Sequence, residues 1–110
     1  MGVANPSKRK GTAFERQVAD WLKDNGFPDA DRSVLRGNKD RGDIIGLACW
    51  CLELKATRQI DLAGALDEAA REAKNLGTEF YAAVIKRRRK SVAAAYVVMP
   101  LKTFVRLTPR

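Results

Sequence analysis

The chain has 110 residues, enough for one domain but too few for a second hydrophobic core. Its 21 Lys and Arg residues exceed its 13 Asp and Glu residues, and the formal net charge of +8 favours polyanionic partners, of which nucleic acid is the commonest. There is no histidine, so histidine-ligated zinc sites, Ser-His-Asp triads and nucleases with a histidine base are excluded, and hydrolysis would have to use carboxylates, lysine and a hard metal ion.

The first part of the chain is predicted to hold a basic arm and one helix. Residues 1–11 are basic and polar, and we expect them to form a flexible arm ahead of a single domain over residues 12–110. Apolar side chains at helical spacing predict a helix from Thr12 to Asn25, with Gly26 as its C-terminal cap. The apolar stripe consists of Phe14, Val18, Trp21 and Leu22.

The rest of the chain is predicted to hold strands around one further helix. Asp61 is a candidate N-cap for that helix, and Gly77 is a candidate end. Its buried stripe would comprise Leu62, Leu66, Ala69, Ala70, Ala73 and Leu76. Strands are expected within residues 32–36, 42–48, 49–56, 79–86 and 93–99, with a short helix or turn from Pro100 to Leu107. The order α-β-β-β-α-β-β predicts an α/β domain in which helices flank a mixed central sheet.

Hydropathy and cysteine use predict a cytoplasmic protein without a membrane partner. No apolar run approaches the roughly 20 residues that a membrane span needs, and no apolar stretch follows the basic N-terminus as it would in a secretory signal. Cys49 and Cys51 lie too close together on one expected strand for an ordinary structural disulfide. We therefore expect buried free thiols in a reducing compartment.

Three charged residues could carry chemistry. Glu53 and Lys55 are two apart on an expected strand, so both side chains would project from one face. Asp43 begins the preceding strand, and antiparallel pairing would bring it beside Glu53. Two adjacent carboxylates repel unless a cation lies between them, and Mg²⁺ prefers oxygen ligands. Lys55 could then orient a water molecule or help to deprotonate it. A structural salt bridge on an edge strand is the alternative that the pattern leaves open.

Two further glutamates have interpretations that need no catalysis. A second E-x-K, from Glu72 to Lys74, lies in the expected second helix, where residues two apart do not share a face, and we interpret it as solvated. Glu15 stands three residues after Thr12, which is the spacing of a capping box, and the cap alone would account for it.

Basic residues near these acids predict contacts with nucleic-acid phosphates. Those expected to bind phosphates are Lys8, Arg9, Lys10, Arg36, Lys39, Arg41 and Arg58. The run from Lys86 to Lys90 is predicted to be a solvated hairpin tip instead.

The order of these motifs resembles a known family. The segments KGTAFERQVADWLKDNGF, GDIIGL and LELKAT, followed by a helix and two strands, are similar to the archaeal-type Holliday junction resolvases and their phage relatives. These belong to the PD-(D/E)xK, or restriction-endonuclease-like, nuclease superfamily. The resemblance runs from Lys10 to about Leu107, and it is strongest in the succession of a helix glutamate, an aspartate and Glu-x-Lys.

The resemblance implies a restriction-endonuclease-like fold, an activity and a set of site residues. The catalytic residues would be Glu15, Asp43, Glu53 and Lys55. The metal ligands would be Asp43, Glu53 and the backbone carbonyl of Leu54, with Glu15 as a further candidate. The cofactor would be Mg²⁺, for which Mn²⁺ can substitute. The protein would be a homodimer that nicks four-way DNA junctions symmetrically in recombination and repair, at the nucleoid or in the cytoplasm of a phage-infected host. A two-fold dimer suits a two-fold substrate because one interface sets the distance between both active sites.

The sequence departs from the family pattern at two places. Gly42 precedes Asp43 where the family has proline, and the second helix has no glutamine, so that Glu68 or Asn75 would lie near its place. The superfamily acts on many substrates. A nuclease for flaps, ends or single strands is therefore the first alternative, and a non-catalytic basic DNA-binding module is the second.

Overall fold

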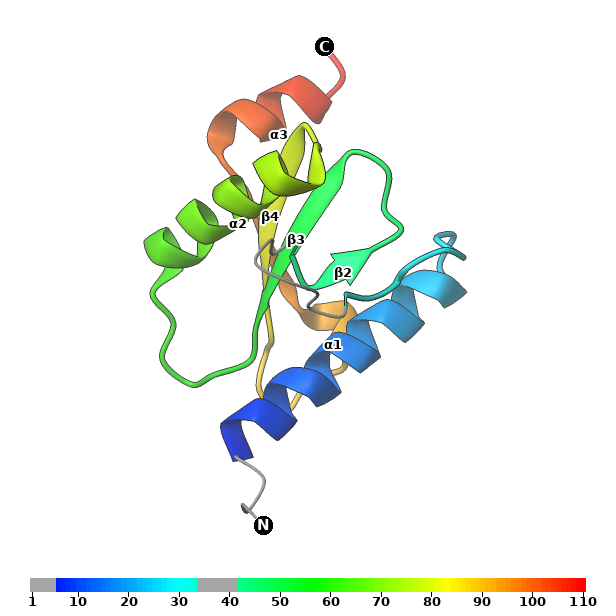
Figure 1. The fold of residues 1–110 in the computed structure, drawn as a ribbon, viewed down its shortest axis with the longest axis vertical. Helices are drawn as coiled ribbons and strands as arrows, with labels where there is room; N and C mark the ends of the chain where they lie inside the picture. The colour runs from blue at the N-terminus through cyan, green and yellow to red at the C-terminus, as the bar shows by residue number, and fades with distance from the viewer. Residues whose placement is uncertain (1–5, 34–41) are drawn as a thin grey trace.

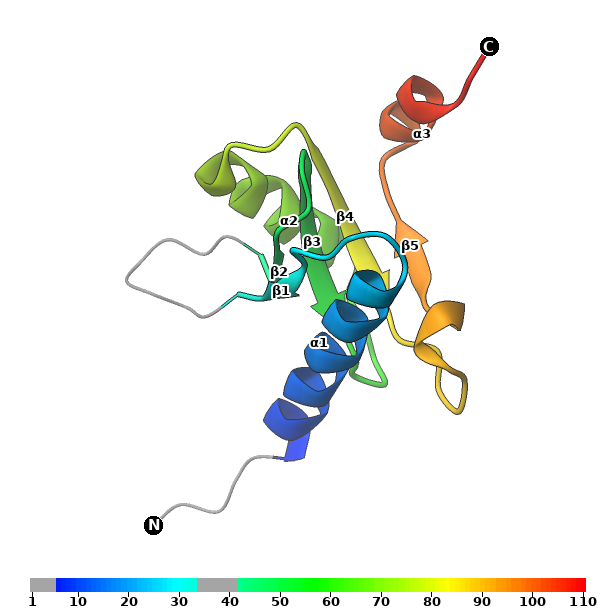
Figure 2. The same cartoon turned by 90° about the vertical axis from the view of Figure 1, so that its right-hand side faces the viewer.

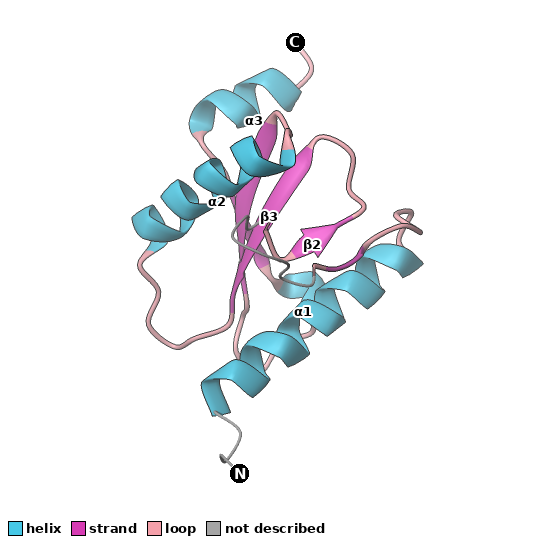
Figure 3. Ribbon diagram, in the orientation of Figure 1, coloured by secondary structure: helices cyan, strands magenta, loops and turns pink. Residues whose placement is uncertain are grey.

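The computed structural model describes residues 6–33 and 42–110, which form a mixed five-stranded sheet flanked by helices (Figures 1 and 3). The elements in chain order are α1 (Pro6–Asp24), β1 (Asp31–Arg32), β2 (Ile44–Ile45), β3 (Trp50–Lys55), α2 (Leu62–Leu76), β4 (Phe80–Ile85), the 3-10 turn η1 (Val92–Ala94), β5 (Tyr96–Val98) and α3 (Leu101–Leu107). The predicted α/β class and the order α-β-β-β-α-β-β are confirmed, with α3 following β5.

Hydrogen bonding orders the sheet β1-β2-β3-β4-β5. Strands β3 and β4 run parallel, with Glu53 opposite Ala83 and Lys55 opposite Ile85, whereas the other neighbouring pairs are antiparallel. Parallel neighbours need a crossover connection, and α2 supplies it. β3 is therefore the middle strand of the sheet, and α2 packs against both β3 and β4 (Figure 1).

The apolar core lies between α1 and one face of the sheet. Leu52 and Leu54 project from β3 to this face, where they join Phe14 and Val18 of α1. The other buried members of the cluster are Ala19, Ala30, Ile44, Ala82 and Val84. Because side chains alternate along a strand, Glu53 projects from β3 to the opposite face, away from this core.

Helix α2 covers that opposite face with small side chains. Its buried apolar residues are Ala65, Ala69 and Ala73. Helices that pack through small side chains approach their neighbours closely. The predicted boundaries of α2 are confirmed, because the side chain of Asp61 accepts a hydrogen bond from Gly64 N at 3.0 Å and Gly77 forms a left-handed C-cap. Leu62, predicted to be buried, is exposed, since it stands at the first turn of the helix.

Helix α1 begins earlier than the sequence predicts. It starts at Pro6 rather than Thr12, so residues 6–11 are helical and only residues 1–5 of the expected arm lie outside the described part. Thr12 is therefore inside the helix and cannot be its N-cap, and the predicted capping box is wrong. Trp21, predicted to be core, is 40% exposed because it borders an apolar hollow of about 250 Å³ beside α1.

Several predicted strands have other bounds in the structure. The strand expected over residues 42–48 is only Ile44–Ile45, and of the strand expected over residues 32–36 the structure describes Asp31–Arg32. The strand expected over residues 93–99 divides into η1 and β5. Cys49 precedes β3 in a turn with φ of 71° and is exposed, whereas Cys51 is buried in β3. The prediction of free thiols is confirmed for both, but the prediction of burial is wrong for Cys49, because the turn into β3 points it outward.

The C-terminal elements extend away from α2. Figure 2 shows α2 and the β5–α3 segment on opposite sides of β3 and β4. The side chains of Arg88, Arg89 and Lys90 are exposed in the connection between β4 and β5, as predicted for a solvated tip. Across the described ranges, no helix combines the length and the apolar character that a membrane crossing requires.

Candidate metal centre

Glu53 and Lys55 lie on one face of β3, as their spacing predicts. Lys55 Nζ is 3.4 Å from Glu53 Oε1. Glu53 is only 5% exposed, because β3 is the middle strand and α2 covers its face. A charged carboxylate at such a place is costly unless cations or hydrogen-bond donors surround it.

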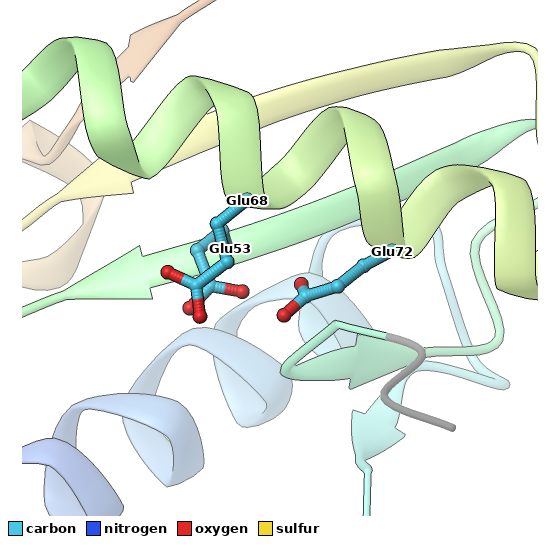
Figure 4. Close-up of side chains that lie close together, drawn as sticks. All are labelled: Glu53, Glu68 and Glu72. Atoms are coloured by element: carbon cyan, nitrogen blue, oxygen red, sulfur yellow. The ribbon is translucent and has the colours of Figure 1, made fainter. Parts of the chain in front are cut away.

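Helix α2 brings two more carboxylates to this pair. Lys55 Nζ also donates a hydrogen bond to Glu68 Oε2 at 3.2 Å. Glu72 lies one helical turn after Glu68, on the same side of the helix. One oxygen of each of Glu53, Glu68 and Glu72 lies within 4.8 Å of the others, and Figure 4 shows the three side chains gathered beneath α2. We call these three residues the acidic cluster.

The acidic cluster keeps Lys55 in its charged form. Burial by itself would lower the pKa of Lys55. The hydrogen bond to Glu68 and the negative charges of Glu53 and Glu68 outweigh that effect, so the pKa is raised above its ordinary value. A raised pKa favours the ammonium form of Lys55, which donates hydrogen bonds to its neighbours.

One oxygen of Glu53 lacks a hydrogen bond among the described residues. Glu53 Oε2 is buried, and no donor from residues 6–33 or 42–110 reaches it. Buried polar atoms without a partner are uncommon in folded proteins, and each indicates strain, a function or an unseen ion or water.

Asp43 lies against β3 but outside the acidic cluster. The antiparallel pairing of Ile44 with Leu52 brings it there, as expected. Its backbone N–H donates to Leu52 O at 2.9 Å, and its Oδ2 accepts a hydrogen bond from Leu54 N at 2.7 Å. Asp43 thus satisfies a backbone donor of β3 at the point where β2 begins, next to Glu53 in the sheet.

Gly42 explains why proline does not precede Asp43 in this chain. Its φ is +84°, which proline cannot adopt.

Gly42→Ala is expected to lower the free energy of unfolding by about 2 kcal/mol, because the new Cβ would lie 2.8 Å from Cys51 Sγ at a left-handed φ. Urea denaturation would measure the loss. Gly26→Ala is the control, since Gly26 is also left-handed but has no atom within 4 Å of that Cβ position. Equal losses in the two variants would contradict close packing at Gly42.

Glu15 has a different partner from the one that its spacing predicts. Its Oε2 is 3.3 Å from Arg32 NH2, which joins α1 to β1. Glu15 does not belong to the acidic cluster. Its local role is therefore an ion pair between two elements rather than a helix cap.

The predicted phosphate contacts fall on three parts of the chain. Lys8, Arg9 and Lys10 belong to the first turns of α1 rather than to a loose arm. Arg36, Lys39 and Arg41 lie outside the described residues. Arg58 is exposed in the loop between β3 and α2. That loop also borders a pocket of about 360 Å³ whose lining includes Lys55 and Glu68, so the acidic cluster adjoins an opening to solvent on this side.

Glu72 is the residue that the motif analysis misjudged. It was predicted to be solvated, but it is 3% exposed and faces β3. The spacing of Glu72 and Lys74 shows that the two do not share a face, but it does not show which of them faces the sheet. The useful signal was its position relative to the alanine stripe, because residues 65, 69, 72 and 73 recur at helical spacing on one face.

Comparison with family models, with curated proteins and with solved structures found no match to this chain.

Proposed function

We propose that this protein is a metal-dependent DNA endonuclease with a PD-(D/E)xK centre on a restriction-endonuclease-like fold. The observation that carries the proposal is the pair of Glu53 and Lys55 on one face of the middle strand, with Glu53 buried and Lys55 Nζ 3.4 Å from it. A buried carboxylate and a lysine beside a pocket are typical of a catalytic site. The position of Asp43 beside β3 supplies the third member of the motif.

The donors at this centre suit a hard divalent ion. Asp43, Glu53 and the carbonyl of Leu54 offer oxygen atoms only, which favours Mg²⁺ with Mn²⁺ as a substitute. Glu53 Oε2, buried and without a described donor, fits a ligand position. When bound, the ion would polarise the scissile phosphate and stabilise the charge that develops on it.

The protein's own residues would position the phosphate. Lys55 would act as an ammonium group that neutralises a phosphate oxygen and orients a water molecule, since the neighbouring Glu68 and Glu53 raise its pKa. Basic side chains around the centre, among them the exposed Arg58, would hold the DNA backbone without reading bases. The net charge of +8 supports binding to a polyanion.

The proposed substrate is a four-way DNA junction, which a homodimer would nick at two symmetric positions. A closed two-fold dimer fits a substrate of the same symmetry, because both active sites then lie at one fixed separation. The resemblance of the Glu15, Asp43 and Glu53-x-Lys55 succession to the junction resolvases supports this choice of substrate over a flap or a free end.

The test is cleavage of a labelled synthetic four-way junction, with a matched duplex and a flap as controls. We expect paired symmetric nicks with Mg²⁺ or Mn²⁺ and none with EDTA. Metal-dependent cleavage of flaps or ends alone would retain the nuclease centre and overturn the junction assignment. Junction binding without cleavage of any substrate would leave a DNA-binding module and overturn the catalytic proposal.

A further inference from the structure

Four consecutive basic residues follow β4 at the end of the sheet where the proposed centre lies. This segment, which we call the basic tip, consists of Arg87, Arg88, Arg89 and Lys90. Because β3 and β4 run parallel, the chain leaves both strands at the same end, and Lys86 N donates a hydrogen bond to Lys55 O at 3.0 Å. Ligands of open α/β sheets commonly bind beyond the carboxyl ends of the strands. The basic tip therefore begins beside the end of β3 that carries Lys55.

Tyr96 holds one cation of the basic tip on the face of the sheet that bears Lys55. Lys55 pairs with Ile85 of β4, and Ile85 pairs with Tyr96 of β5. Directly paired residues project from one face of a sheet, so Tyr96 shares the face of Lys55, about 10 Å away across two strand spacings. The guanidinium group of Arg87 lies over the Tyr96 ring, 5.4 Å from its centroid. This cation–π contact keeps Arg87 at the border of that face.

The cations of the basic tip have no carboxylate partner within the described ranges. Arg88, Arg89 and Lys90 are exposed, and no ion pair between residues of 6–33 and 42–110 includes the tip. Arg89 has a φ of 62°, which is uncommon for a residue other than glycine, and it turns the chain back so that the side chains stay close together. Like charges gathered in this way repel one another, and a polyanion is the partner that relieves the repulsion.

We infer that the basic tip binds the phosphate backbone of DNA on the β4 side of the scissile phosphate, as a second contact besides Arg58. Arg58 lies in the β3–α2 loop, which borders the pocket of about 360 Å³ lined by Lys55. Figures 1 and 2 both show this loop and the β4–β5 connection at the lower end of the molecule. Guanidinium groups donate two hydrogen bonds at once to a phosphate, which suits a run with three arginines.

The inference rests on the proposed function for the identity of the polyanion as DNA. It goes beyond that function because it assigns a contact to residues that the sequence pattern leaves to solvent. The exposure of the tip is confirmed, but exposure beside the centre is also what a phosphate contact requires.

The test is binding of the labelled four-way junction in EDTA, measured by fluorescence anisotropy over a series of salt concentrations. The double variant Arg88→Gln with Lys90→Gln should raise Kd by at least about 10-fold and lower the slope of log Kd against log salt concentration by about two, since each lost phosphate contact releases about one counterion fewer. The slope also guards against misfolding, because a smaller active fraction shifts the apparent Kd without changing the slope.

Arg71→Gln with Lys74→Gln is the matched control, since it changes the net charge equally. Both residues are exposed in the second half of α2, which runs back toward the start of β4 and away from the basic tip. Charges farther than about 10 Å from DNA are largely screened at 0.1 M salt, so the control should stay within about 2-fold of the wild-type Kd. Equal rises in Kd for the two double variants would overturn the inference. So would a tip variant with unchanged Kd, or one with a raised Kd and an unchanged slope.

The two proposals can fail separately. Junction binding that needs the basic tip, without cleavage of any DNA, would uphold the phosphate contact and overturn the nuclease. Metal-dependent cleavage by a protein whose junction affinity ignores the basic tip would uphold the nuclease and overturn this contact.

Discussion

Glu53→Gln is expected to lower metal-dependent cleavage of a four-way junction by at least about 100-fold. Glutamine keeps the size of the side chain, but it removes the negative charge that would attract the ion and the charge that pairs with Lys55 at 3.4 Å. Initial rates at saturating Mg²⁺ would measure the effect. The protein should remain folded, because the substitution reduces the crowding of carboxylates beneath α2.

The control for this variant is Asp67→Asn, which changes the net charge equally at an exposed position of α2. Its cleavage rate should match that of the wild type. Junction binding by Glu53→Gln in EDTA should also be unchanged, so that the lost rate reflects chemistry rather than affinity. A Glu53→Gln protein that cleaves at the wild-type rate would leave Glu53 as a structural residue and contradict the proposed centre.

Lys55→Met is expected to reduce both cleavage and stability. The variant removes the ammonium group that pairs with both Glu53 and Glu68. We expect the free energy of unfolding to fall by about 2 kcal/mol, less than for a fully buried pair, because the Lys55 side chain is partly exposed. Urea denaturation in EDTA measures this loss, and the junction assay measures the loss of cleavage.

A double variant separates charge from packing at this position. In Lys55→Met with Glu68→Gln, one of the repelling carboxylates is gone, so part of the lost stability should return while cleavage stays absent. If the double variant is no more stable than Lys55→Met alone, the loss arises from packing of the lysine stem rather than from electrostatics.

Much of the site could be predicted from local patterns. A two-residue spacing on a strand places Glu53 and Lys55 on one face wherever that strand lies, because alternation is a property of the backbone. In the same way, Asp61 and Gly77 bound α2 through local capping geometry, which the structure confirms. The pairing of β2 with β3 followed from their adjacency in the chain, since neighbouring strands commonly form antiparallel pairs.

Other parts of the site depend on contacts between distant residues. Glu15 has the spacing of a capping box, but α1 begins at Pro6, so Thr12 lies inside the helix and cannot cap it. Glu15 pairs with Arg32 instead. The Thr12–Glu15 spacing does not show where the helix begins, and a capping box forms only at the start of a helix. The burial of Glu72 likewise depends on which face of α2 packs against β3.

The sequence by itself therefore determined the α/β class, the bounds of α2 and the shared face of Glu53 and Lys55, because each depends on backbone geometry over a few residues. Only the tertiary structure decided that α2 would bring Glu68 and Glu72 to Glu53. That arrangement follows from the parallel pairing of β3 with β4 and from the crossover helix that the pairing requires. Packing across the sheet, rather than local spacing, assembled the acidic cluster.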